Sequence, residues 1–158
     1  ADAEAAVKYC SYPPDGLRGV SGICRASDYG LREEYLIHAS NEISILVQIE
    51  NLDGLKNLEK IIDTEGIDGI FIGPSDLAAS MGKLGSSSDK TVEDEIKKAV
   101  KLIIGKNKPA GIIALSNESG IQRFSQGFDF VAVAHDAHFI SKELRALKSQ
   151  FSNYLQQI

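Results

Sequence analysis

The chain has 158 residues, of which 43% are hydrophobic and 25% are charged, a composition typical of a globular domain and not of a disordered chain. Its 22 acidic and 17 basic residues give a formal net charge of −5 without any block of Lys and Arg, so we expect no nucleic-acid partner. The apolar runs are only a few residues long, which excludes a segment that spans a bilayer, and we expect no membrane partner.

The start of the chain and its cysteines bear on cellular context. Residues 1–8 form a charged, helix-like stretch without an apolar signal core or an initiator Met, so we expect a part of the protein upstream of residue 1 to be absent. Cys10 and Cys24 fit no zinc-binding spacing and do not make a disulfide framework. We interpret them as reduced thiols of a cytoplasmic protein, in preference to a disulfide.

Four short apolar runs alternate with segments of helical character along the chain. The runs are rich in β-branched residues and nearly continuous, which is typical of strands buried on both faces of a parallel sheet. Strand and helix alternate throughout, which predicts the α/β class. The predicted strands cover 43–50, 67–72, 110–115 and 128–134, and the helices that follow them cover about 52–63, 76–81, 118–126 and 137–155.

Three further segments complete the pattern. A helix with Thr91 as its capping residue and acidic residues in its first turn is predicted to continue to about Ile104. The Gly- and Ser-rich stretch 82–88 before it is predicted to be a loop. Residues 9–30 contain a Pro-Pro-Asp-Gly turn and an irregular region, and a loop of that length is more often functional than idle.

Two architectures fit this order of elements. Four βα units are half of a (β/α)8 TIM barrel, a fold of about 250 residues. The same units could instead form a small, doubly wound open sheet. A Gly-x-Gly-x-x-Gly motif does not follow the first strand, which counts against a dinucleotide-binding version, whereas a flavodoxin-like version remains open on pattern alone.

Two carboxylates stand at the ends of neighbouring predicted strands. Glu50 ends the first strand, and Asp76 comes just after the second. The carboxyl ends of parallel strands meet at one edge of the sheet, where α/β proteins bind ligands. Mg²⁺ is typically held there by one or two carboxylates, with substrate and water as the other ligands. The alternatives are a solvated Glu50 and an Asp76 that only caps a helix.

The turn from Gly73 to Asp76 has a second possible role. A strand that passes through glycine into a helix presents free backbone N–H groups and the positive end of the helix dipole, which together favour an anion. A small carboxylate could therefore lie on the N–H groups of Ser75 and Asp76, beside a metal on Asp76. The alternative is a plain strand-to-helix turn.

Several linked motifs then occur in a fixed order. They are YPPDGLRG at 12–19, RAS at 25–27, VQIE at 47–50 and GIDGIFIGPSDLA at 66–78. In order and spacing they resemble the class II pyruvate aldolases, the 4-hydroxy-2-oxoheptanedioate and 2-dehydro-3-deoxyglucarate aldolase group. Segments 111–113 and 130–136 are similar to the seventh and eighth strands of that barrel. The resemblance implies that residues 1–158 are one domain, the C-terminal part of a TIM barrel with strands 5–8, and that the N-terminal half is absent.

The resemblance also implies a site and a reaction. Glu50 and Asp76 match the family's metal ligands, which bind Mg²⁺, Mn²⁺ or Co²⁺. Gln48, Gly73, Ser75 and Asp76 match its substrate-binding positions, where the metal and the backbone hold pyruvate. The implied reaction cleaves a 4-hydroxy-2-oxo acid into pyruvate and a small aldehyde, with sugar acids among the substrates, through a metal-stabilised enolate.

The chain departs from the family pattern in its catalytic residues. The family's enolate-orienting arginine and its histidine base lie on early strands and have no counterpart here, so we expect no catalytic residue in this chain. Arg18 and Arg25 belong to a different loop and do not replace them.

A second departure is the sequence at the last strand end, where relatives place Gly and a small or apolar residue before the aspartate. His135, Asp136 and His138 stand together there and resemble a metal cluster. We favour capping of the last helix by Asp136, with exposed imidazoles. His38 is predicted to lie on the surface.

The C-terminal segment repeats apolar residues at helical spacing and is predicted to be the last barrel helix. These residues are Leu144, Leu147, Phe151, Tyr154 and Leu155. In the resembled family this helix is exchanged between subunits of a hexamer, which implies a homo-oligomer. Two other functions stay open: a citrate-lyase-β-like acyl-CoA lyase, and a non-catalytic half-barrel that binds metal and pyruvate or only self-associates.

Overall fold

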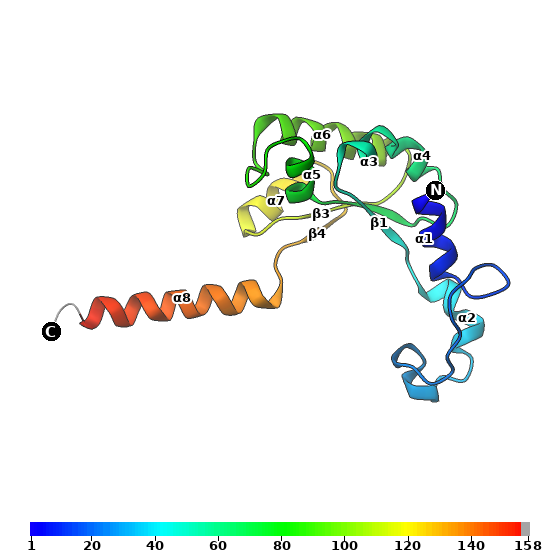
Figure 1. Ribbon diagram of the computed structural model, residues 1–158. Helices are drawn as coiled ribbons and strands as arrows, with labels where there is room; N and C mark the ends of the chain where they lie inside the picture. The colour runs from blue at the N-terminus through cyan, green and yellow to red at the C-terminus, as the bar shows by residue number, and fades with distance from the viewer. Residues whose placement is uncertain (156–158) are drawn as a thin grey trace.

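The computed structural model describes residues 1–155 and has at its centre a four-stranded parallel sheet with helices packed on one side (Figure 1). The strands are β1 (Leu46–Ile49), β2 (Gly69–Ile72), β3 (Ala110–Ile113) and β4 (Phe130–Ala132). The helices are α1 (Asp2–Cys10), η1 (Arg25–Gly30), α2 (Tyr35–Glu42), α3 (Leu52–Lys56), α4 (Leu58–Ile62), α5 (Pro74–Ser80), α6 (Lys90–Gly105), α7 (Asn117–Ser125) and α8 (Asp136–Leu155).

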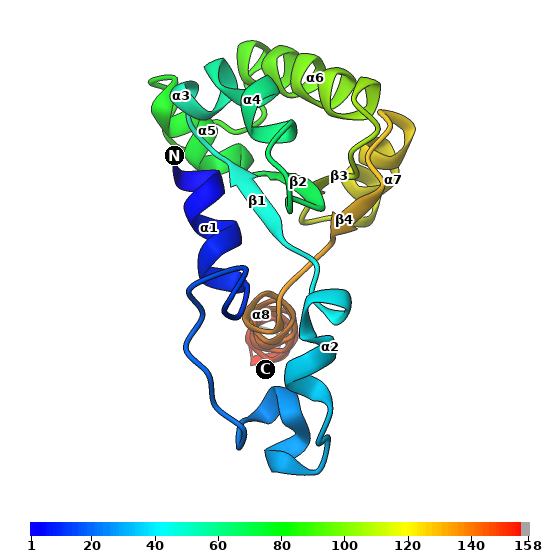
Figure 2. The ribbon, with the colours of Figure 1, turned by 90° about the vertical axis from the view of Figure 1, so that its right-hand side faces the viewer.

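The strand order decides between the two architectures. The sheet runs β1-β2-β3-β4 in sequence order, and every neighbouring pair is parallel. A doubly wound sheet requires a reversal of strand order with helices on both faces. Here α3 to α6 lie on the same side of the sheet (Figures 1 and 2). The α/β prediction is confirmed, the arrangement is that of consecutive units of a (β/α)8 barrel, and the flavodoxin-like alternative is wrong.

The core lies between the sheet and these helices. Ile49, Ile70, Ile72 and Ile112 point to the helical side and are buried. They pack against residues of α4, α5 and α6, among them Leu58, Leu77, Val92, Ile96, Val100 and Ile103. On the opposite face the larger side chains are exposed or only half-buried, so the predicted burial on both faces is wrong for this chain; these residues are Leu46, Gln48, Phe71, Ile113 and Phe130. Only the helical side has a packed layer over it in residues 1–155.

Two helix predictions required adjustment. The helix expected over 52–63 is divided at Asn57 into the short helices α3 and α4. The helix expected from Thr91 begins one residue earlier, and its cap is Asp89, whose Oδ1 accepts hydrogen bonds from the N–H (2.9 Å) and the hydroxyl (2.5 Å) of Thr91. The pKa of Asp89 is lowered to about 2. The hydrogen bond from the Thr91 hydroxyl contributes most, followed by the one from the Thr91 N–H and by the nearby Lys83.

The region before the sheet contains α1, an irregular stretch and the turn-like η1. Gly16 permits the tight turn after α1, because a Cβ there would lie 2.3 Å from the carbonyl oxygen of Ser11. In η1 the buried Ser27 hydroxyl accepts hydrogen bonds from the N–H groups of Cys24 and Gly30. Cys10 and Cys24 are both free thiols, as predicted. Residues 1–155 contain no helix both long and apolar enough to cross a membrane.

The last helix leaves the body of the protein. After β4 the chain crosses a short extended segment, and α8 then runs away from the sheet (Figure 1). The predicted helix is confirmed, but its apolar residues are exposed instead of packed on the sheet. They are Phe139, Ile140, Leu144, Leu147, Phe151, Tyr154 and Leu155.

Candidate functional site

The predicted metal ligands follow neighbouring strands. Glu50 is the first residue after β1, and Asp76 is the third residue of α5, which begins directly after β2. Ile49 pairs with Ile72 in the parallel ladder, and the N–H of Gly73 donates to the carbonyl oxygen of Ile49 at 3.0 Å. The two strand ends are thereby joined, and both carboxylates belong to the same edge of the sheet.

Gln48, Glu50 and Gly73 are brought into direct contact at this edge. Gln48 and Glu50 are two residues apart, which places both side chains on the same face of the extended chain. The Nε2 of Gln48 donates to Oε2 of Glu50 at 2.6 Å. A Cβ on Gly73 would lie only 2.5 Å from that Nε2 and 3.1 Å from the Cβ of Glu50.

Asp76 and Ser75 are exposed in the first turn of α5. The N-cap residue of this helix is Gly73, and it has no side-chain cap hydrogen bond. The alternative in which Asp76 only caps the helix is therefore not what the structure has. An acidic residue in a first turn is favourable beside the helix dipole, and its oxygens here face solvent.

The donor set at this edge fits a hard divalent cation. Glu50 and Asp76 offer carboxylate oxygens, the ligands that Mg²⁺ and Mn²⁺ prefer. In the part of the chain that the structure describes, His, Cys, Asp and Glu nowhere gather in threes in a metal-binding arrangement. Two carboxylates match the one or two that Mg²⁺ typically takes from a protein.

The segment around the start of α8 has the contacts of a helix terminus. The N–H of His138 donates to Nδ1 of His135 at 3.2 Å, and the two rings meet edge to face with centroids 5.9 Å apart. Among the residues that the structure describes, the carboxylate of Asp136 accepts a hydrogen bond from the N–H of the next residue, Ala137. The cap is therefore His135, and the prediction that Asp136 caps this helix is wrong, because Asp136 is already the first helical residue.

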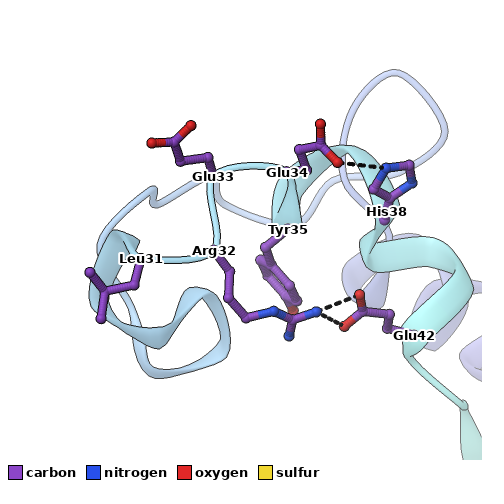
Figure 3. Close-up of a pocket in the computed structure, with 7 residues that line it drawn as sticks. All are labelled: Leu31, Arg32, Glu33, Glu34, Tyr35, His38 and Glu42. Atoms are coloured by element: carbon purple, nitrogen blue, oxygen red, sulfur yellow. Dashed lines mark hydrogen bonds and ion pairs between the residues drawn. The ribbon is translucent and has the colours of Figure 1, made fainter.

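A surface hollow of about 530 Å³ is lined by α2 and by the four residues before it, and none of the strand-end residues lines it (Figure 3). Two pairs of side chains meet there: Arg32 donates to both oxygens of Glu42 at 2.6 and 2.7 Å, and Nε2 of His38 lies 3.6 Å from Oε2 of Glu34. The hydrogen bond between Arg32 and Glu42 raises the pKa of Arg32 and lowers the pKa of Glu42. His38 is exposed, as predicted. We do not assign the site to this hollow, since its one arginine is already paired with Glu42.

A second hollow, of about 820 Å³, adjoins the strand edge. It is bounded by the first turn of α1 and by α3, and both Gln48 and Glu50 line it. The sequence interpretation placed Gln48 at this edge but missed its hydrogen bond to Glu50 and the space that Gly73 provides. The spacing of two residues on a strand was the available signal for the hydrogen bond between Gln48 and Glu50. The space at Gly73 could not be predicted in this way, because it depends on contact between β1 and the end of β2.

Comparisons with known proteins agree on one family. The family model described as HpcH/HpaI aldolase/citrate lyase matches residues 1–142. The hydroxypyruvate/pyruvate aldolase of Pseudomonas aeruginosa is 41% identical over 152 residues, which are 96% of this chain and 57% of that protein. The 5-keto-4-deoxy-D-glucarate aldolase of Shigella dysenteriae is 39% identical over 95% of this chain and 59% of its own length. The chain thus spans less than two thirds of these relatives.

Solved structures give the same result. An HpcH/HpaI aldolase/citrate lyase family protein from Burkholderia cenocepacia superimposes with a TM-score of 0.86 and 32% identity, over 96% of this chain and 60% of that one. Macrophomate synthase superimposes with a TM-score of 0.76 and 26% identity, over 96% of this chain and 54% of that one.

Proposed function

The chain belongs to the HpcH/HpaI aldolase/citrate lyase family, and from this premise we propose that it carries the metal- and pyruvate-binding edge of a class II aldolase. The proposed reaction is the cleavage of a 4-hydroxy-2-oxo acid into pyruvate and a small aldehyde, with sugar acids among the substrates. Relatives named as hydroxypyruvate/pyruvate and 5-keto-4-deoxy-D-glucarate aldolases support this substrate class. The observation that carries the proposal is the joining of Gln48, Glu50 and Gly73 at the strand edge that also bears Asp76.

In this proposal Glu50 and Asp76 hold Mg²⁺, Mn²⁺ or Co²⁺. When bound, such a cation supplies Lewis-acid stabilisation for the enolate of pyruvate. Ser75 and Asp76 lie in the exposed first turn of α5, so their backbone N–H groups are open to the carboxylate of the substrate. Gln48, Gly73, Ser75 and Asp76 are therefore the proposed substrate-binding residues.

We further propose that the four βα units are strands 5–8 of a (β/α)8 barrel, with residues 1–158 as its C-terminal part. The partly exposed sheet face, which carries Gln48, Phe71 and Phe130, supports this, since the inner face of a complete barrel is filled by side chains. The lengths of the relatives agree with it. In this proposal the general base and the orienting arginine belong to other strands, and no residue of this chain is assigned a catalytic role.

Association and location complete the proposal. The apolar side of α8 is exposed over most of its length, and we propose that another copy of the chain covers it in a homo-oligomer, a hexamer with exchanged α8 helices. An exposed apolar surface of this kind marks a protein interface. The free thiols of Cys10 and Cys24 support a cytoplasmic location.

Calorimetric titration of Mn²⁺ into the chelator-treated chain, with and without pyruvate, tests the metal site. We expect binding that tightens with pyruvate and is lost in Asp76→Ala, because one of two protein ligands is removed. The matched control is Asp94→Ala, which removes an exposed carboxylate paired with Lys90 on α6, away from the strand edge. Equal Mn²⁺ affinity in the wild-type chain and Asp76→Ala would show that the carboxylate pair is not a metal site.

A further inference from the structure

Gln48 of β1 and Glu50, the first residue after β1, form a hydrogen-bonded pair at the strand edge. The amide Nε2 of Gln48 donates a short hydrogen bond of 2.6 Å to Oε2 of Glu50. Both residues lie at least partly in solvent, so neither is held by close packing. A free glutamate side chain samples several rotamers, and a ligand that must fix it loses that entropy on binding. The amide of Gln48 therefore restricts the Glu50 carboxylate before any cation arrives.

Gly73 determines whether this pair can form. Its φ of −97° and ψ of 93° lie in a region open to any residue, so glycine is not needed there for its backbone conformation. It is needed for space, because a Cβ would lie 2.5 Å from Nε2 of Gln48. The backbone of Gly73 is also held on both sides: its N–H donates to Ile49, and its carbonyl oxygen accepts from Leu77, each at 3.0 Å. A side chain at 73 must then displace the flexible amide of Gln48.

We infer that Gln48 is a positioning residue that orients Glu50 for the metal, and that Gly73 acts through Gln48 by leaving room for its amide. This inference rests on the proposed metal site and adds to it two residues that act on metal affinity without being ligands. The closest contacts carry it: Nε2 to Oε2, and Nε2 to the position of the missing Cβ. Partners of this kind typically contribute about 10- to 100-fold to metal affinity.

The test is a double-mutant cycle read by calorimetric Mn²⁺ affinity and by the thermal unfolding midpoint, so it does not depend on turnover. Gln48→Ala and Gly73→Ala should each weaken Mn²⁺ binding by about 10- to 100-fold. The Mn²⁺ affinity of the double variant should stay within about twofold of that of Gln48→Ala, because the alanine at position 73 then has no glutamine amide to displace. The matched control is Gly105→Ala at the end of α6, where a Cβ meets open space and affinity should not change.

The remaining outcomes separate this inference from the proposed function. Mn²⁺ binding that is lost in Glu50→Ala and Asp76→Ala, but unchanged in Gln48→Ala, overturns the inference and leaves the metal site standing. Independent, multiplicative losses in the double variant overturn the part assigned to Gly73. A wild-type chain that binds no Mn²⁺ overturns both. If Gly73→Ala unfolds below the titration temperature, Gln48→Ala decides alone, since it only shortens an exposed side chain.

Discussion

Helices α6 and α8 share an amphipathic sequence pattern, but the apolar side of α6 is buried and that of α8 is exposed. Both are long and amphipathic, with 16 and 20 residues. On α6, Ile96 is 0% exposed against the sheet, whereas Leu144 and Phe151 on α8 are 61% and 66% exposed. Amphipathic spacing thus predicts a helix that will bury one side, but it does not identify the surface that covers that side.

Ionic contacts accentuate the difference between the two helices. Arg123 of α7 donates to both oxygens of Glu93 on α6, at 2.5 and 2.7 Å, and these side chains are mostly buried. At the other end of α6, Lys106 contacts Asp63 and Glu59. By contrast, α8 departs from β4 through a short extended segment. Helix α6 is therefore held by contacts within this chain, while the apolar side of α8 is free to contact another chain.

The largest expected effect comes from a truncation in the α6 core. Ile96→Ala should lower the free energy of unfolding by about 2–5 kcal/mol, because it removes buried methyl groups and leaves a cavity. Leu144→Ala should change it by less than about 0.5 kcal/mol in dilute protein, since that side chain is already in solvent. Urea unfolding at low protein concentration measures both. Similar losses in the two variants would mean that α8 folds back onto its own chain.

A charge on α8 should act on association instead of stability. Leu144→Glu should weaken self-association by about tenfold or more, because a carboxylate would have to be buried in an apolar contact. Sedimentation velocity over a range of protein concentrations measures this. Leu84→Glu is the control, as Leu84 is an even more exposed leucine in the loop before α6. An unchanged distribution of species in Leu144→Glu contradicts the proposed role of α8.

The smallest expected effect concerns the cap of α6. The pKa of Asp89 is about 2 in the folded chain, below its ordinary value of 3.8, so the ionised cap stabilises the fold above about pH 4. That contribution should be lost as the pH falls from about 4 to about 2. Asp89→Asn keeps an oxygen that caps the helix and removes the titration. Urea midpoints from pH 2 to 5 should therefore decline less in Asp89→Asn than in the wild-type chain, and parallel curves would contradict the prediction.

Local rules predicted much of the fold. The four strands and the long helices were found from apolar runs and helical spacing, because those patterns depend on residues close in sequence. The errors were also local: Asn57 interrupts the helix expected over 52–63, and the caps are Asp89 and His135 instead of Thr91 and Asp136. A neighbouring residue could take each role, and only the backbone geometry selects one.

The sequence by itself determined that Glu50 and Asp76 stand at the ends of consecutive strands, since their positions follow from the order of elements along the chain. Only the tertiary structure decided that the strands pair in the order β1-β2-β3-β4 and that α8 finds no cover in residues 1–155. It also decided that Gly73 leaves room for the amide of Gln48 beside Glu50. These features depend on distances between segments far apart in sequence, which no local pattern encodes.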